Sequence, residues 1–334
     1  MAKKMKIGII GAGRIGKVHS QSIMYHIPEV EIKAISDINL DAAKEWAAKM
    51  GIPVAADDYH VILNDPEIDI ILICSSTDTH ATISIEAAKA GKHIFCEKPV
   101  DLSVEKVEAV LKAVEEANVK FQVGFNRRFD HNFRQVKNLI DAGKVGDLHI
   151  VKITSRDPAP PPAEYVKVSG GMFLDMTIHD FDMARYLVGS EVGEVYVSAA
   201  VRVDPAIGEA GDVDTAVITL KFEDGTICVI DNSRKAAYGY DQRVEVFGSK
   251  GKVMVSNDTP SSAVLSTEEG VFGEKPKYFF LERYMESFVD EMKEFIDAVV
   301  NDKEVPVTGI DGLKPVLIGL AAKKSVQEGR PVRL

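Results

Sequence analysis

The stretch "MKIGIIGAGRIG", residues 5–16, decides the fold of this chain. It is an apolar run that ends in G-x-G-x-x-G, with Gly11, Gly13 and Gly16, and a helix-length segment follows. Between a strand and a helix, such glycines permit a tight turn and let the backbone approach a pyrophosphate, while the helix N-terminus supplies amide donors. Three glycines can also form an ordinary turn, so the surrounding sequence has to decide.

The surrounding sequence repeats a strand-and-helix unit up to residue 125. Short β-rich runs alternate with helix-length segments, and the runs are "EIKAISD" at 31–37, "IDIILICS" at 68–75, "HIFCEKP" at 93–99 and "KFQVGF" at 120–125. Continuous apolar strands joined by helices indicate a parallel sheet with both faces covered. The clearest helix runs from Ser103, a plausible cap, to Ala117. We therefore predict a doubly wound α/β domain of the Rossmann type over residues 1–125.

Beyond residue 125 the pattern changes to long runs in which apolar and polar residues alternate. Two such runs are "VGEVYVSAAVRV" at 192–203 and "DTAVITLKFEDGTICVIDNSR" at 214–234, and the turn "EDGT" predicts an antiparallel hairpin. Helical patterns occur near 130–141, 175–188, 283–300 and 311–328. We predict an α+β domain over residues 126–334, with a large, mostly antiparallel open sheet and helices on one face. Apolar residues on the uncovered face favour a homo-oligomer.

The composition narrows the class of partner. A chain of 334 residues exceeds one typical hydrophobic core, and its net charge of -11, without a block of basic residues, argues against nucleic acid. No segment approaches the roughly 18 apolar residues that a membrane span requires. Three cysteines without CxxC spacing suggest a reducing, cytoplasmic setting. A small molecule is therefore the expected partner.

The acid at the end of the second predicted strand indicates which dinucleotide binds. Asp37 lies about 20 residues after the last glycine, where this fold places the carboxylate that binds the ribose hydroxyls. A carboxylate repels a 2′-phosphate, and the next residues, Ile38 and Asn39, offer no cation. NAD is therefore favoured over NADP. The alternative is that Asp37 only caps the strand end.

Two further motifs carry candidates for chemistry. "HIFCEKPV", residues 93–100, places Lys98 at a strand end, where it could stabilise the alkoxide character of a substrate hydroxyl, although such a lysine is often simply solvated. In "GGMFLDMTIHDFDMARYLV", residues 170–188, Asp175 and His179 are four residues apart and share a helical face. An imidazole with a pKa near 6.5 suits a general base. The alternatives are a helix cap for Asp175 and a core histidine for His179.

The two remaining acids of that stretch, Asp180 and Asp182, point elsewhere on the predicted helix. We assign them to caps, ion pairs or interface contacts. A metal site built from Asp175, His179 and a further carboxylate fits the spacing, but a nearby lysine would compete with the ion, so no metal is expected.

Together, "GAGRIG", "EKP", "GFNRRF" at 124–129 and "GGMFLDMTIHDFDMARYL" resemble the glucose–fructose oxidoreductase/inositol dehydrogenase (Gfo/Idh/MocA) family, in the same order and along essentially the whole chain. The last motif is most similar to inositol 2-dehydrogenases, which oxidise myo-inositol to 2-keto-myo-inositol. The resemblance implies an NAD-dependent oxidoreductase that oxidises a secondary hydroxyl of a cyclic polyol. Hydride would pass to C4 of the nicotinamide, with His179 as base. It also implies a tetramer.

The resemblance assigns roles to individual positions. The implied catalytic residues are Lys98, Asp175 and His179. Those expected around the dinucleotide are Gly11, Gly13, Arg14, Ile15, Gly16, Asp37, Ser75, Thr77, His80, Glu97, Lys98 and Asn126. Those expected at the substrate are Lys98, Arg127, Asp157, Asp175, His179 and, more weakly, Tyr238.

Two other functions stay open from the sequence. One is a dehydrogenase of an aldose or another cyclitol on the same scaffold, and the other is a non-catalytic regulator that senses NAD(H). A regulator would need neither Lys98 nor a base at His179, which favours an enzyme. The sequence leaves open the inositol isomer, the hydroxyl that reacts, the physiological direction, the strictness for NAD and the size of the oligomer.

Overall fold

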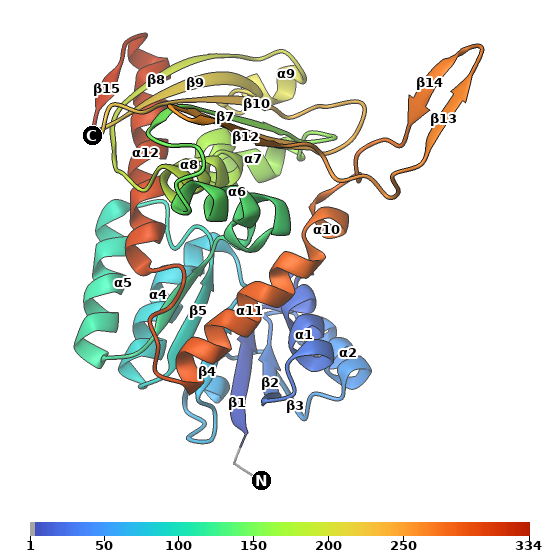
Figure 1. Cartoon of the computed structure of the whole chain (residues 1–334). Helices are drawn as coiled ribbons and strands as arrows, with labels where there is room; N and C mark the ends of the chain where they lie inside the picture. The colour runs from blue at the N-terminus through green and yellow to red at the C-terminus, as the bar shows by residue number, and fades with distance from the viewer. Residues whose placement is uncertain (1–3) are drawn as a thin grey trace. The chain divides into compact units, whose positions relative to one another are not determined.

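The computed structural model describes residues 4–334 and divides into two compact units (Figure 1). The first unit contains the chain up to Phe129 together with Glu286–Val316, and the second contains Asp130–Met285 and Leu317–Leu334. Residues 286–316 thus join the first unit, whereas the sequence pattern groups them with the second. The reason is that α11 (Met285–Val300) buries Met292, Phe295 and Ile296 in the same apolar core as the first strand of the chain.

The first unit is built on a parallel sheet of six strands. Their order is β3-β2-β1-β4-β5-β6, so that β1 lies between strands that continue outward on both sides. The strands are β1 (Met5–Ile10), β2 (Val30–Ser36), β3 (Val54–Ala56), β4 (Ile70–Ile73), β5 (His93–Glu97) and β6 (Phe121–Gly124). This arrangement confirms the predicted Rossmann-type sheet. In such sheets ligands bind at the carboxyl ends of the strands where the strand order reverses, here β1 and β4.

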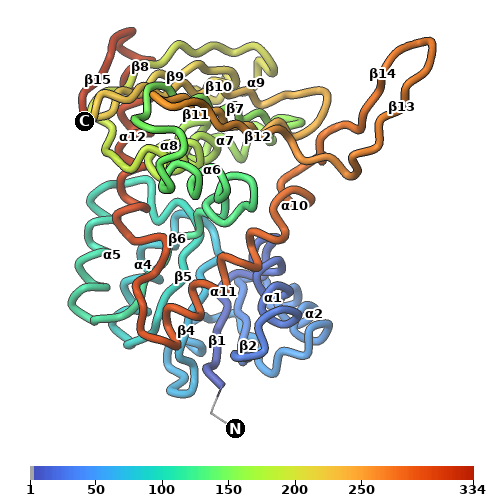
Figure 2. The backbone as a smooth tube through the Cα atoms, viewed as in Figure 1, coloured from blue at the N-terminus to red at the C-terminus, as the bar shows by residue number. Residues whose placement is uncertain are grey.

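Helices and short turns connect these strands. They are α1 (Arg14–His26), α2 (Leu40–Met50), α3 (His60–Leu63), α4 (Thr77–Lys89), α5 (Val104–Ala117) and the 3-10 turn η1 (Asn126–Phe129). The predicted cap of α5 is present, since the Ser103 hydroxyl accepts from the backbone N–H of Lys106 at 3.3 Å. In the backbone trace, the orange helix α11 lies beside the blue strand β1, far from it in sequence (Figure 2).

The second unit contains a mixed, mostly antiparallel sheet of seven strands in the order β12-β11-β7-β10-β9-β8-β15. The strands are β7 (Leu148–Arg156), β8 (Val192–Ala200), β9 (Thr215–Phe222), β10 (Ile227–Ser233), β11 (Asp241–Gly248), β12 (Gly251–Val255) and β15 (Val332–Arg333). Within it β10 and β7 run parallel, while β10 and β9 form the hairpin that "EDGT" predicts. The predicted α+β architecture is confirmed.

The two faces of this sheet differ. Alternate residues such as Val151, Ile218 and Ile230 are buried on the helix-covered face, whereas Ile150 and Ile227 on the opposite face remain exposed. The helices of this unit are α6 (His131–Asp141), α7 (Ala163–Ser169), the π-helix η2 (Met172–Met176), α8 (Ile178–Val188), α9 (Pro205–Glu209), α10 (Phe280–Arg283) and the second part of α12 (Gly309–Glu328).

A two-stranded hairpin of β13 (Val264–Thr267) and β14 (Gly270–Gly273) projects away from this sheet (Figure 1). The sequence pattern did not predict it. Among residues 4–334, no helix combines the length and the apolarity that crossing a membrane requires.

Candidate active site

The glycine loop after β1 leaves room at one position. A Cβ on Gly11, which has φ +105°, would lie 2.5 Å from the backbone carbonyl of Cys74, and a Cβ on Gly16 would lie 2.0 Å from the carbonyl oxygen of Gly11. A Cβ on Gly13 would meet nothing within 4 Å. The first and third glycines are therefore required by the protein's own backbone. The space over Gly13, at the start of α1, is where a pyrophosphate can approach the chain.

Asp37 follows β2 and is tied to this loop. Its Oδ2 accepts from the backbone N–H of Ala12 at 2.7 Å, and its Oδ1 accepts from that of Asn39 at 2.8 Å. The cap of α2 is Asn39, whose side chain accepts from Ala42 N–H at 3.2 Å. Asp37 is thus positioned beside the glycine loop, as a ribose-binding carboxylate requires.

The segment after β4 contributes Ser75, Thr77 and His80. The Ser75 hydroxyl lies 2.7 Å from that of Thr79, and Thr77 is the first residue of α4. His80 is buried, with its Nδ1 2.8 Å from the carbonyl of Pro99 and its Nε2 3.1 Å from that of Ser75. The imidazole therefore connects the carboxyl ends of β4 and β5. Its predicted contact with the dinucleotide stays a prediction.

The EKP motif is held by a histidine that the sequence analysis did not select. His19 on α1 is fully buried, and its Nε2 lies 2.6 Å from Oε1 of Glu97. Its ring meets Phe95 edge-on, with centroids 5.0 Å apart. A Cβ on Gly124 would come within 3.0 Å of the same carboxylate. Glu97 is thus bound to His19 and lies close to the backbone of Gly124, immediately before Lys98 and the cis peptide bond to Pro99.

Asn126 and Arg127 lie in η1, which follows β6. Both are buried, with 5% and 4% of their surface exposed, and the amide of Asn126 is 3.5 Å from the Ser287 hydroxyl on α11. Polar and charged side chains are seldom buried this deeply, so the surrounding packing determines the positions of both. Their predicted contacts with nicotinamide and substrate stay predictions.

In the second unit, Asp175 and His179 are the only residues between 171 and 185 that are not fully buried. Asp175 lies in the π-helix η2 and His179 in the first turn of α8. The residue before α8 is Thr177, so Asp175 is not the cap of that helix. Their buried neighbours include apolar residues such as Phe173, Ile178 and Phe181. The two polar side chains therefore reach the surface together, one helical turn apart.

The start of this segment is fixed by two glycines and a half-buried acid, Asp212. Gly170 and Gly171 both have positive φ, +89° and +75°, and a Cβ on Gly171 would lie 2.7 Å from Oδ1 of Asp212. Oδ2 of Asp212 accepts from the backbone N–H of Met172 at 2.7 Å. Burial raises the pKa of Asp212, and hydrogen bonds from backbone N–H groups partly offset this.

Asp157 and Asp175 share one buried cation, Arg234, which the sequence analysis did not select. Nη1 of Arg234 donates to Oδ2 of Asp157 at 3.2 Å, and Nη2 donates to Oδ2 of Asp175 at 3.3 Å. Burial lowers the pKa of Arg234, but the charges of Asp175 and Asp157 outweigh it, so the pKa is raised overall. Oδ1 of Asp175 also accepts from the Tyr165 hydroxyl at 3.1 Å.

The buried acid Asp180 supports the same segment from the sheet. The side chain of Asn232 on β10 donates to Oδ2 of Asp180 at 2.9 Å and to the carbonyl of Ser155 at 3.2 Å, and it accepts from the Thr177 hydroxyl at 2.7 Å. Asp182 is also buried. Asp180, which the sequence analysis assigned to a cap, an ion pair or an interface contact, thus accepts a hydrogen bond from an asparagine of the sheet.

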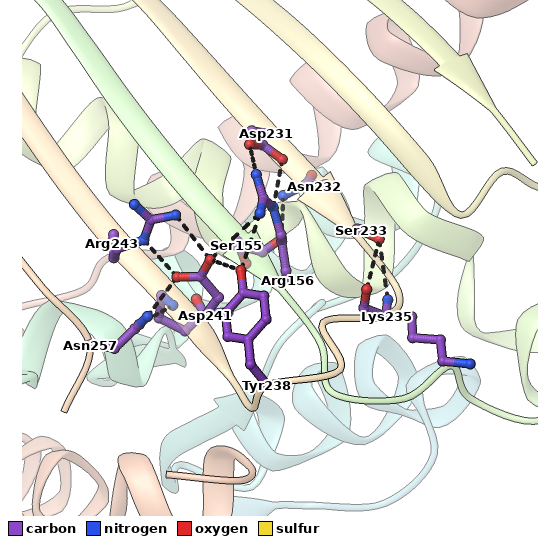
Figure 3. Close-up of polar contacts among 11 residues, drawn as sticks. Ser155, Arg156, Asp231, Asn232, Ser233, Lys235, Tyr238, Asp241, Arg243 and Asn257 are labelled. Atoms are coloured by element: carbon purple, nitrogen blue, oxygen red, sulfur yellow. Dashed lines mark hydrogen bonds and ion pairs between the residues drawn. The ribbon is translucent and has the colours of Figure 1, made fainter. Parts of the chain in front are cut away.

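Tyr238 lies in the connection between β10 and β11, within a polar network (Figure 3). Its hydroxyl donates to Asp241 and accepts from Nη1 of Arg156 at 3.2 Å, while Nε of Arg156 donates to Asp231 at 3.0 Å. Burial, together with the hydrogen bond to Asp241, raises the pKa of Tyr238. The tyrosine side chain is 42% exposed overall. Its predicted substrate contact stays a prediction.

Over residues 4–334, no three or more His, Cys, Asp or Glu side chains are grouped so that they could hold a metal ion.

Comparison with known proteins decides the family. Residues 5–125 match the model of an oxidoreductase family with an NAD-binding Rossmann fold, and residues 133–254 match the GFO/IDH/MocA C-terminal domain. The chain belongs to the GFO/IDH/MocA oxidoreductase family. Its first unit is therefore an NAD-binding domain, and the space over Gly13 and the position of Asp37 fit that cofactor.

Several members of the GFO/IDH/MocA family resemble the chain over its full length. The myo-inositol 2-dehydrogenase of Thermotoga maritima is 50% identical, over 99% of this chain and 98% of its own. The inositol 2-dehydrogenase of Rhizobium meliloti is 44% identical, over 99% of each chain. A solved structure of scyllo-inositol dehydrogenase from Lactobacillus casei, with bound NAD(H) and scyllo-inositol, is 32% identical, covers 99% of each chain and has a TM-score of 0.93.

Proposed function

We propose that this oxidoreductase uses NAD to oxidise a secondary hydroxyl of a cyclic polyol, and that its substrate is myo-inositol, which becomes 2-keto-myo-inositol. The observation that carries the proposal is the pair Asp175 and His179, the two side chains of residues 171–185 that reach the surface. The names of the two most similar dehydrogenases described above support inositol as the substrate.

The residues around the glycine loop would hold the dinucleotide. Gly13 and the first turn of α1 would face the pyrophosphate, and Asp37 would bind the ribose hydroxyls. NAD, when bound, accepts a hydride at C4 of its nicotinamide. The carboxylate of Asp37 would repel the 2′-phosphate of NADP.

Side chains of the protein carry out the other steps of the proposed reaction, which are proton removal and stabilisation of the charge on the substrate oxygen. His179 takes the proton of the hydroxyl that is oxidised. Asp175 orients the imidazole or accepts from a neighbouring hydroxyl, and Lys98 stabilises the developing negative charge on the substrate oxygen. Arg127, Asp157 and Tyr238 are proposed to contact the rest of the polyol.

The decisive experiment measures reduction of NAD and of NADP with a panel of inositols and aldoses. We expect the largest kcat/KM with myo-inositol and NAD. A larger value with an aldose or another cyclitol would identify the alternative substrate. NADH binding without turnover of any polyol would leave a regulator as the function.

A variant tests the proposed base. His179→Ala should lower kcat by about 10²- to 10⁴-fold, the usual contribution of general base catalysis, while the dissociation constant of NADH stays unchanged. Equal loss of turnover and of NADH binding would show that His179 is structural.

We further infer a homotetramer, assembled through the uncovered face of the seven-stranded sheet. Phe247, Ile150 and Ile227 are neighbours across β11, β7 and β10 and are 45%, 37% and 43% exposed. Contiguous exposed apolar residues of this kind mark protein interfaces. Sedimentation at micromolar concentration tests this, and a monomer would contradict it.

The three buried cysteines, none of them in a disulfide, suit the cytoplasm as the proposed location.

A further inference from the structure

Arg234 occupies an unusual position for an arginine. It follows β10 directly, its backbone N–H donates to the carbonyl of Asp214 at 2.8 Å, and only 3% of the residue is exposed. Burying a guanidinium is costly unless carboxylates pair with it and accept its hydrogen bonds. Asp157 and Asp175 meet that requirement, so the three side chains form one unit.

The side chain of Arg234 is more deeply buried than those of its two partners. The side chain of Arg234 is 4% exposed, whereas those of Asp157 and Asp175 are 15% and 16% exposed. The guanidinium thus lies beneath two carboxylates that reach the surface. Each carboxylate contacts a different terminal nitrogen of the same planar group, so the rigid geometry of the guanidinium sets their separation.

The backbone that carries Asp157 is fixed as well. Its N–H donates to the carbonyl of Ser233 at 2.9 Å, and its own carbonyl accepts from Ala236 N–H at 2.6 Å. These bonds continue the pairing of β7 and β10 past the ends of both strands. Asp175 is held independently by the π-helix η2, whose first residue, Met172, donates its backbone N–H to Asp212. The guanidinium therefore connects two acids whose main chains are already placed by separate elements.

We propose that Arg234 is a positioning and specificity-determining residue, which holds the carboxylates of Asp157 and Asp175 so that they accept hydrogen bonds from the two hydroxyls of the polyol that flank the oxidised carbon. This inference rests on the proposed function. A carboxylate accepts up to about four hydrogen bonds, so one that is bound to a guanidinium can also accept from a substrate hydroxyl. Two carboxylates at a fixed separation select a polyol that has a hydroxyl on each side of the oxidised carbon, because a ligand that lacks one of these hydroxyls leaves one acid without its donor.

The experiment compares myo-inositol with its two monodeoxy analogues that lack one hydroxyl next to the oxidised carbon. Hydrogen bonds to charged groups contribute enough that the wild-type enzyme should lose about 10- to 100-fold in kcat/KM with at least one analogue. In Arg234→Gln, the KM for myo-inositol should rise, and the loss caused by the missing hydroxyl should shrink to within about threefold. The dissociation constant of NADH should not change.

Arg185→Gln is the matched control. Arg185 is 9% exposed on α8, the helix of His179, and its Nη2 pairs with Glu191 at 2.6 Å. This variant also removes a largely buried guanidinium, yet it should keep the wild-type ratio between myo-inositol and the deoxy analogues. A purely structural role for Arg234 would lower the folded fraction and reduce kcat for all three substrates equally, at unchanged KM. That outcome would overturn the proposal.

A second variant covers the case in which Arg234→Gln does not fold. Asp157→Asn keeps the shape of the side chain and leaves Asp175 paired with Arg234. It should abolish the discrimination against one deoxy analogue and retain it against the other, and unchanged discrimination against both would contradict the proposal. Failure of the wild-type enzyme to oxidise any polyol would instead refute the proposed function, and the role of Arg234 with it.

Discussion

In the glycine loop, the same substitution to alanine should affect different properties at two positions, nucleotide binding at Gly13 and stability at Gly16. Gly13 has φ -73° and ψ -166°, which alanine adopts without strain, and a Cβ there meets nothing within 4 Å. Gly13→Ala should therefore leave the stability of the protein without nucleotide unchanged or higher by up to about 1 kcal/mol, because alanine has fewer unfolded conformations than glycine.

The added methyl group of Gly13→Ala occupies the space in which the pyrophosphate approaches the backbone. Inserting a methyl group into a closely packed site costs about 1–3 kcal/mol, so the dissociation constant of NADH should rise about 5- to 150-fold. At Gly16 the same methyl group would lie 2.0 Å from the carbonyl oxygen of Gly11. Gly16→Ala should therefore lower the free energy of unfolding of the protein without nucleotide by about 1–3 kcal/mol or more.

Two measurements separate these effects. Thermal unfolding without nucleotide should give a Tm at or above the wild-type value for Gly13→Ala and a lower Tm for Gly16→Ala. A fluorescence titration gives the affinity for NADH. If Gly13→Ala binds NADH as tightly as the wild-type protein, the cofactor does not approach the backbone at this glycine. An unchanged Tm for Gly16→Ala would show that the loop relaxes around the new methyl group.

Three further predictions concern other parts of the chain. Asp37→Ala should lower the ratio of kcat/KM with NAD to that with NADP, and an unchanged ratio would refute the role of Asp37. Arg283→Met should destabilise the protein by about 3–5 kcal/mol in urea unfolding, since it leaves the buried Asp130 without the guanidinium that contacts both its oxygens. Burial raises the pKa of all three cysteine thiols, so a thiol reagent at pH 8 should label the protein only after denaturation.

Much of the fold could be predicted because its signals are local. The strand runs, the glycine loop and the "EDGT" turn each lie within a few residues, and both sheets follow from them. The spacing of Asp175 and His179 is also local, which is why both could be selected as a pair. Their partial exposure does not follow from helical periodicity alone, since Asp182, three residues after His179, is buried.

The features that escaped prediction depend on distant contacts. Arg234 lies 77 residues from Asp157 and 59 residues from Asp175, so no local pattern connects them. His19 is likewise 78 residues from Glu97. The π-helix at Met172–Met176 has the apolar pattern of an ordinary helix, and the constraint that accompanies it comes from Asp212, 40 residues beyond Met172. Such constraints become visible only when the chain is folded.

The segment from Ser233 to Asp241 has a consequence for how the protein can evolve. Within it, Arg234 turns inward to the carboxylates of Asp157 and Asp175, while Tyr238, four residues later, joins Arg156 and Asp241 at the sheet end. Insertions or deletions here would disturb both groups at once. Drift in this connection is therefore restricted to substitutions that preserve its length, and new substrate preferences are more accessible through Tyr165 or other side chains outside it.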